Sequence, residues 1–221
     1  MLSRTVPFSD LLASGRWRAD LHVHKGDELK SSKYDMVTLG EVVQQSKKAI
    51  DPKDINSSET TYIGLENVSP VTGDPVGITD AAADSVKSRS KIFAPGDVLY
   101  GRLRPYLRKA LFVESPLSNG ICSTEFLVLQ ADKSRILPEF LRELLVSEPV
   151  TEHLTRMQGG AALPRVSAKD LLGLSVPLPP IDEQKKIVQQ LRHSNKKRKE
   201  LLQKVEDLTG ETQNLVVNIF S

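Results

Sequence analysis

The chain has 221 residues, of which 39% are hydrophobic and 26% are charged, so it has the composition of a soluble protein with one core and room for an extension. Its charge-free stretches are too short to cross a membrane, and its N-terminus lacks the apolar core of a signal peptide. The single cysteine, Cys122, excludes an internal disulfide. Together these features predict a cytoplasmic protein with no membrane partner.

The net charge of +2 is distributed unevenly along the chain. Residues 87–109, the basic window, contain seven basic residues and one acidic residue, which gives this segment a charge of +6. By contrast, residues 1–86 carry −4 and residues 110–181 carry −2. Positive charge concentrated in one short segment predicts a polyanion partner more strongly than the overall isoelectric point does.

Most of the first 180 residues are predicted to form short elements separated by turns. Ahead of the basic window, we expect helical segments at residues 8–13 and 39–45, the second with Thr38 as its cap, and a strand at residues 60–65. Further along, the pattern predicts strands at residues 98–103, 108–113 and 126–129 and helices at residues 138–146 and 150–157.

The C-terminal part has a different pattern. Three closely spaced prolines, Pro177, Pro179 and Pro180, exclude a helix just before Asp182, which can cap the helix that follows. That helix is predicted over residues 182–217, about 54 Å at ~1.5 Å per residue. Six apolar residues on it follow a heptad register: Ile187, Leu191, Leu201, Val205, Leu208 and Leu215. A small domain cannot cover so long a stripe, so the pattern predicts a partner helix.

These elements predict an α+β fold with two parts. Residues 1–180 would form a globular mixed α/β domain, and residues 181–221 would form a long C-terminal helix that makes a coiled coil. The helix would serve as the dimerisation surface.

The strongest candidates for a binding surface lie in and near the basic window. If the strand at residues 98–103 continued to Pro105, Tyr100, Arg102 and Arg104 would share one exposed face, and guanidinium groups there could contact phosphates or guanine. The full set of candidate DNA-binding residues is Arg89, Lys91, Tyr100, Arg102, Arg104, Tyr106, Arg108, Lys109 and Arg165. The alternative is a solvated sheet face whose charges pair with neighbouring acids.

Other patterns favour ordinary structural roles over chemistry. The segment with Arg165 and Ser167 could contact phosphates or simply connect the domain to the helix, with Ser167 capping a short helix at residues 168–172. The pair His22 and His24 has no further histidine or cysteine cluster, so no metal site is expected. The sequence also lacks a phosphate-binding glycine loop that ends in Gly-Lys-Ser/Thr, and no catalytic residues are expected.

Several short stretches, in order and spacing, resemble the specificity subunits of Type I restriction-modification enzymes over residues 36–215. They are residues 62–67 (YIGLEN), 96–105 (GDVLYGRLRP), 123–126 (STEF), 163–167 (LPRVS) and 176–180 (VPLPP), followed by Glu183, Gln184, Ile187 and Val188. The resemblance implies a target-recognition domain at residues 1–180 and a helical spacer at residues 181–221.

The same resemblance implies a non-catalytic function. One target-recognition domain would read half of a bipartite site in double-stranded DNA, and the helix would set the distance to the other half. Methyltransferase subunits would supply S-adenosylmethionine chemistry, and a restriction/translocase subunit would use ATP and magnesium, so no cofactor belongs to this chain. Specificity subunits of the family usually carry two such domains and two spacers. One of each predicts a half-length subunit that forms a homodimer through antiparallel C-terminal helices.

Two other functions remain open from sequence. An enzyme would need clustered acids or a nucleophile next to a base, and neither pattern is present. A protein-interaction adaptor would use the long helix without reading DNA.

Overall fold

The computed structural model describes residues 8, 29–55, 59–78, 80–82, 85–158, 163–217 and 219. The helical segment predicted at residues 8–13, apart from Phe8, and the pair His22 and His24 lie outside the described residues. The chain forms two compact units, Met1–Ile181 and Asp182–Ser221, which we call the body and the arm.

A four-stranded antiparallel sheet runs through the body in the order β2-β10-β7-β8. Its strands are β2 (Val43–Gln45), β10 (Phe126–Ala131), β7 (Val98–Gly101) and β8 (Ala110–Phe112). All four residues of β7 and the first four of β10 are buried. These two neighbouring strands are almost uninterrupted apolar runs, as expected for strands covered on both faces.

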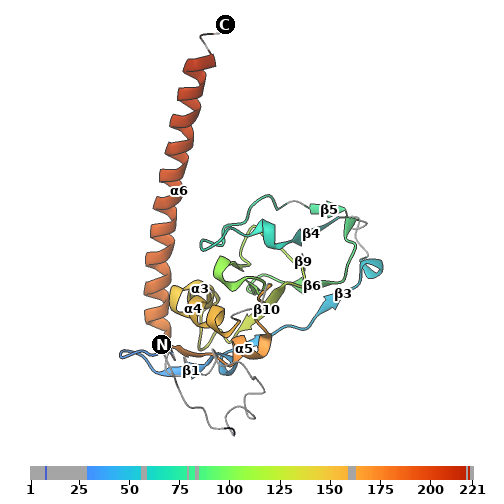
Figure 1. Ribbon diagram of the computed structural model, residues 1–221, viewed down its shortest axis with the longest axis vertical. Helices are drawn as coiled ribbons and strands as arrows, with labels where there is room; N and C mark the ends of the chain where they lie inside the picture. The colour runs from blue at the N-terminus through green and yellow to red at the C-terminus, as the bar shows by residue number, and fades with distance from the viewer. Residues whose placement is uncertain are drawn as a thin grey trace. The chain divides into compact units, whose positions relative to one another are not determined.

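A second, five-stranded sheet has the order β3-β6-β9-β4-β5. Its strands are β3 (Ala49–Ile50), β6 (Ser90–Phe93), β9 (Gly120–Cys122), β4 (Glu59–Ile63) and β5 (Asp80–Ala82). Only the β4–β9 pair is parallel; the other pairs are antiparallel. Figure 1 shows β4, β9 and β6 side by side in this sheet.

The core lies where the two larger sheets meet. A cluster of buried side chains from both sheets and their connections fills this space: Ile63, Val68, Phe93, Leu99, Leu111, Val113, Cys122, Phe126 and Val128. Burial of these apolar side chains is the main force that holds the two sheets together.

Short elements complete the body. A two-stranded antiparallel sheet pairs β1 (Met36–Thr38) with β11 (Ser175–Pro177), two segments far apart in sequence. Among the residues that the structure describes, short helical elements lie between the strands: the 3-10 helices η1 (Leu39–Glu41), η2 (Pro52–Asp54), η3 (Leu65–Asn67) and η5 (Pro105–Leu107), and the α-helix α5 (Ala168–Leu172). Asp170 donates its backbone N–H to the Ser167 hydroxyl at 3.0 Å, which confirms the predicted cap of α5.

Two helices pack beside the four-stranded sheet. α3 (Pro138–Val146) contacts β7, β8 and β10, and α4 (Glu148–Met157) contacts α3 and η5. The helix at residues 138–146 was predicted with these bounds, and α4 begins two residues before its predicted start. Each helix has a proline in its first turn. Backbone N–H groups in the first turn have no intrahelical acceptor, so the N–H that proline lacks costs no helix hydrogen bond.

The prediction of a helix at residues 39–45 is wrong beyond Glu41. After η1 the chain turns into β2, whose Gln45 pairs with Leu129 of β10. Val42 and Val43 are β-branched and buried, and such residues suit a sheet better than a helix. The predicted cap is present in a modified form, since the backbone N–H of Thr38 donates to Glu41 Oε1 at 3.1 Å.

The arm is formed by α6 (Ile181–Val217), a continuous helix of 37 residues (Figure 1). The predicted long C-terminal helix, and with it the α+β fold class, is confirmed. Asp182 and Glu183 lie in the first turn, where negative charge is favoured by the helix dipole. None of the described helices is long and apolar enough to cross a membrane.

Candidate nucleic-acid interface

The basic window runs through β6, β7 and η5 up to the start of β8. The prediction that Tyr100, Arg102 and Arg104 share one exposed strand face is wrong. β7 ends at Gly101, and Tyr100 is only 1% exposed within the core. Burial raises the pKa of the Tyr100 hydroxyl. Tyr100 is therefore a core residue and is not available to a ligand at the surface.

Three cations of the basic window are held by backbone carbonyl groups. Lys91 Nζ donates to the carbonyl oxygen of Phe126, and Lys109 Nζ donates to that of Leu65 at 2.7 Å. Arg108 Nε donates to the carbonyl oxygen of Val146 at 2.6 Å. Burial lowers the pKa of Lys91, and the charge of Arg102 lowers it further. These three side chains tie strands and helices together, which the sequence did not reveal.

A hydrogen bond to a neutral carbonyl does not cancel the charge of the donor. Lys91, Arg108 and Lys109 therefore still contribute positive potential around the basic window, and they do so from fixed positions. We call these three residues the anchored cations, in contrast to the surface cations Arg89 and Arg104, whose side chains are exposed.

The turn after β7 presents two of the predicted side chains to solvent. Arg104 and Arg108 both adopt the left-handed conformation, with φ of 52° and 53°, and η5 lies between them. The turn is closed by the backbone bonds from Leu107 to Arg104 and from Arg108 to Pro105, at 2.8 and 2.9 Å. Arg104 is exposed, and Tyr106 is 50% exposed. Left-handed backbone at two non-glycine residues is strained, at roughly 1 kcal/mol each.

Arg102 and Arg89 occupy contrasting environments. Arg89, just before β6, is exposed. Arg102 is half-buried, and within the described part of the chain its Nε is a buried donor without a hydrogen-bond partner. A buried donor of this kind is costly unless an acceptor reaches it.

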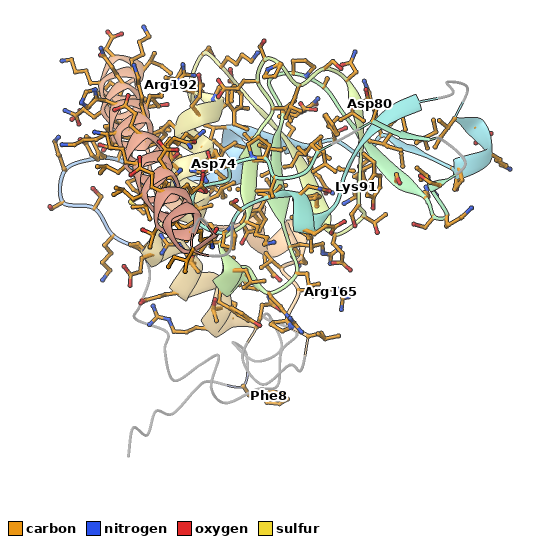
Figure 2. The ribbon with its side chains drawn as sticks, turned by 90° about the horizontal axis from the view of Figure 1, so that it is seen from above. Phe8, Asp74, Asp80, Lys91, Arg165 and Arg192 are labelled. Atoms are coloured by element: carbon orange, nitrogen blue, oxygen red, sulfur yellow. The ribbon has the colours of Figure 1, made fainter. Side chains whose placement is uncertain are left out.

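Arg165, far away in sequence, joins this surface through the backbone. The bridge between Leu103 and Arg165 places the two segments side by side, and Arg102 also bonds to Val166 and Glu125 at 2.9 Å each. The Arg165 guanidinium forms an ion pair with Glu125, with 3.0 Å between Nη2 and Oε1. Lys91 and Arg165 lie on separate segments of the body (Figure 2).

Glu125 was not predicted as a site residue, although it lies in the stretch STEF that carries part of the resemblance. Its side-chain position next to Arg165 depends on pairing between segments 40 residues apart. No local sequence pattern predicts a pairing between segments so far apart.

On α6, the apolar side chains of the predicted seam are uncovered toward its C-terminal half. Leu201, Val205 and Leu208 are 52%, 59% and 62% exposed, and Leu202, which the heptad register missed, is 51% exposed. A shallow, mostly apolar groove on this part of the helix is lined by Ser194, Lys197, Arg198, Leu201, Leu202 and Val205. Ile187 and Leu191 are half-buried, and the side chain of Leu215 lies outside the described residues.

Within the ranges that the structure describes, no three His, Cys, Asp or Glu side chains are grouped as metal ligands would be. Cys122, the only cysteine, is buried, and burial raises its pKa to about 12. Its thiol therefore stays protonated at neutral pH.

Body and arm together define a two-part architecture, a mixed α/β domain followed by one long helix. Residues 31–207 match the model of the Type I restriction modification DNA specificity domain, which covers most of the chain, so the chain belongs to this family. The resemblance found in the sequence is confirmed.

Two curated relatives are specificity subunits. The chain is 33% identical over 100 residues to the Type I restriction enzyme HindI specificity subunit of Haemophilus influenzae, covering 44% of this chain and 22% of the relative. It is 28% identical over 132 residues to the Type I restriction enzyme EcoDI specificity subunit of Escherichia coli, covering 60% and 28%. The chain thus spans less than a third of either relative.

Solved structures show the same fold. The HsdS subunit from Thermoanaerobacter tengcongensis is 29% identical with a TM-score of 0.68, covering 80% of this chain and 46% of that chain. A chain from a structure described as the basis of complex assembly and conformational transition of the type I R-M system is 30% identical with a TM-score of 0.67, covering 77% and 44%. In both cases the chain spans under half of the solved chain.

Proposed function

We propose that this chain is a DNA-sequence recognition subunit of a Type I restriction-modification system and that it reads one half of a bipartite site without doing chemistry itself. The observation that carries the proposal is the arrangement of the basic window. The anchored cations (Lys91, Arg108 and Lys109) are held by backbone carbonyl groups of the body, and the turn that ends at Arg108 presents Arg104 and Tyr106 to solvent. Family membership supports the same function.

The two kinds of cation have different roles in this proposal. The anchored cations supply a fixed positive potential that attracts the DNA backbone and speeds association. The exposed side chains of Arg89 and Arg104 reach individual phosphates, and Tyr106 adds stacking area or a hydroxyl contact. Arg102, whose Nε has no described partner, donates a hydrogen bond to an oxygen atom of the DNA. Tyr100 has no part in this surface.

The partners follow from the family and are part of the proposal. Methyltransferase subunits would bring S-adenosylmethionine, and a restriction/translocase subunit would bring ATP and magnesium, so the chain needs no cofactor of its own. The complex would work in the cytoplasm, where its DNA substrate is found.

The arm carries the second part of the proposal. Leu201, Leu202, Val205 and Leu208 leave apolar surface open on α6, and a second copy of the chain would cover it through an antiparallel helix pair. A two-fold dimer presents two identical recognition domains, so it would read a palindromic split site. The helix then sets the spacing between the half-sites.

The proposal that the basic window binds DNA is tested by measuring how the affinity of the chain for a DNA duplex depends on salt concentration. Arg89→Ala with Arg104→Ala should weaken binding and reduce the slope of log K against log salt by up to about two, since each phosphate contact contributes about 0.9. The matched control is Lys53→Ala with Lys133→Ala, which removes two exposed positive charges outside the basic window. Equal effects of the two pairs would show that the basic window is not the DNA surface.

The dimer is tested by size-exclusion chromatography with light scattering at micromolar concentration. The unmodified chain should elute as a dimer, and Leu201→Glu with Val205→Glu should convert it to a monomer because charges would be buried in the helix pair. A monomeric unmodified chain would contradict this part of the proposal.

The adaptor function is the second candidate, because the same open apolar surface on α6 also fits a different protein. The salt experiment separates the two candidates. If the Arg89→Ala, Arg104→Ala double variant binds DNA as tightly as the unmodified chain, the adaptor function is favoured.

A further inference from the structure

The Arg165 side chain is held by Glu125 in a way that leaves one edge of its guanidinium group open. Nε donates to both carboxylate oxygens of Glu125, at 3.1 and 3.2 Å, and Nη2 lies 3.0 Å from Oε1. The carboxylate therefore occupies the side of the group formed by Nε and Nη2. At the end formed by Nη1 and Nη2, Nη1 and the second N–H of Nη2 have no described protein partner, and the side chain is 43% exposed. A planar guanidinium offers two such edges, and each can make a bidentate contact.

The backbone under both residues is also fixed. Arg165 sits in the bridge with Leu103, and its neighbours are held by bonds from Arg104 to Pro164 at 2.8 Å and from Val166 to Arg102 at 2.9 Å. The carbonyl group of Glu125 accepts the N–H of Arg102 at 2.9 Å, so it lies on the same hydrogen-bonded framework. The Arg165 side chain therefore loses little conformational freedom when its open edge binds a ligand.

Arg165 differs from the surface cations of the basic window, Arg89 and Arg104, because its charge is paired with a carboxylate. The Glu125 carboxylate cancels the charge of Arg165, so the pair adds little to the attraction of phosphates. Arg89 and Arg104 are exposed and have no ion pair among the described residues. The hydrogen bonds that Arg165 donates to Glu125, together with the negative charge of Glu125, raise the pKa of Arg165, so the group remains a full donor at every physiological pH. A neutralised donor pair with fixed direction is suited to reading a base, where direction matters more than charge.

We propose that Arg165 is a specificity-determining residue that reads the O6 and N7 atoms of a guanine in the major groove, and that Glu125 is the positioning residue that directs it. This inference rests on the proposed function and goes beyond it by naming the reading residue, the base and the source of its orientation. Guanine is the base whose major-groove edge carries two adjacent acceptors at the spacing of a guanidinium fork.

The experiment is a binding selection with the 221-residue chain from a pool of DNA duplexes that contain a randomised segment, followed by sequencing of the bound duplexes. The unmodified chain should select a motif that contains a guanine in each half-site. Arg165→Ala should reduce the preference for that guanine by roughly tenfold to a hundredfold and leave the other selected positions in place. Arg165→Lys should not restore the preference, because an ammonium group lacks the planar fork.

Glu125→Gln tests whether Glu125 directs Arg165 or only stabilises the fold, because a purely structural role would leave both the guanine preference and the salt slope unchanged. It should lower the preference for the same guanine, because Arg165 loses its fixed direction. It should also tighten binding to duplexes without the motif and raise the salt slope by up to about 0.9, because the charge of Arg165 is no longer cancelled. The control is Arg104→Ala, which should weaken binding to all duplexes alike and keep the motif. Circular dichroism of each variant checks that it is folded.

The outcomes distinguish the inference from the function on which it rests. If the unmodified chain selects a motif and Arg165→Ala weakens all duplexes equally while lowering the salt slope by about 0.9, then Arg165 is a phosphate contact and the inference is wrong. If Glu125→Gln keeps the guanine preference unchanged, Glu125 has no positioning role. If the unmodified chain selects no motif at all, the proposed recognition function itself fails.

Discussion

Arg108 Nε donates to the carbonyl oxygen of Val146, the last residue of α3, at 2.6 Å. The last carbonyl groups of a helix have no intrahelical donor, and positive charge near them is favoured by the helix dipole. The side chain thus completes the end of α3 and ties it to the turn that presents Arg104 and Tyr106. Arg108, which is predicted to contact DNA, is also part of the support for the candidate surface.

Arg108→Ala should lower the free energy of unfolding by about 1–3 kcal/mol, because it removes a hydrogen bond from a charged donor and leaves a helix carbonyl group unpaired. Arg104→Ala is the matched control, since Arg104 has the same backbone conformation but an exposed side chain. Its effect should stay within about 0.5 kcal/mol. Urea unfolding of the two variants makes the comparison, and equal losses would contradict the anchoring role of Arg108.

Arg104→Gly should be more stable than Arg104→Ala by roughly 0.5–1 kcal/mol. At φ of 52° an alanine keeps the strain of the left-handed backbone, whereas glycine relieves it at the cost of greater freedom in the unfolded chain. Thermal unfolding of the two variants under one set of conditions measures the difference. A less stable glycine variant would show that the turn holds no strain at this position.

The sequence predicts those parts of this fold that depend on local patterns. The helix at residues 138–146 and the cap at Ser167 follow from periodicity and from the chemistry of one side chain, and both are confirmed. The anchoring of Lys109 to Leu65 and the Glu125–Arg165 pair join segments 44 and 40 residues apart. Their existence depends on strand order, which no local pattern contains. For the same reason the alternation of side chains along β7 predicts one exposed face, although the strand is covered on both sides.

Gly73 and Gly77 provide a matched pair for the loop between η3 and β5. Both have positive φ, 63° and 57°, but a Cβ at Gly73 would lie 2.1 Å from the carbonyl oxygen of Ala110, while one at Gly77 would meet nothing within 4 Å. Gly77→Ala should cost about 1 kcal/mol for its backbone conformation alone. Gly73→Ala should cost at least ~2 kcal/mol more, because it also displaces β8 or the buried Arg142. Similar costs in urea unfolding would show that the loop moves freely away from β8.

Gly210→Ala should strengthen α6. Gly210 lies within the helix, and a Cβ there would meet nothing within 4 Å, so the substitution gains helix propensity of about 1 kcal/mol without a clash. Far-UV circular dichroism during heating should show the helical signal of the variant persisting to higher temperature. If the signal is lost at a lower temperature, a partner helix requires the space at Gly210, and the same variant in the light-scattering measurement would then show a weaker dimer.

Cys122 should make the protein less stable at alkaline pH. The thiol is fully buried beside Lys91 and Phe126 in the core region, and burial raises its pKa from 9.0 to about 12. Between about pH 9 and about 12 the unfolded chain has lost the thiol proton while the folded chain keeps it.

The stability that comes from the neutral buried thiol is therefore complete below pH 9 and is lost as the pH rises toward 12, by about 1.4 kcal/mol per pH unit. Cys122→Ala removes this proton, so its free energy of unfolding should fall less steeply than that of the unmodified chain. Urea unfolding at pH 8, 9, 10 and 10.5 measures both slopes, and parallel slopes would show that the thiol ionises as readily in the folded protein as in the unfolded one.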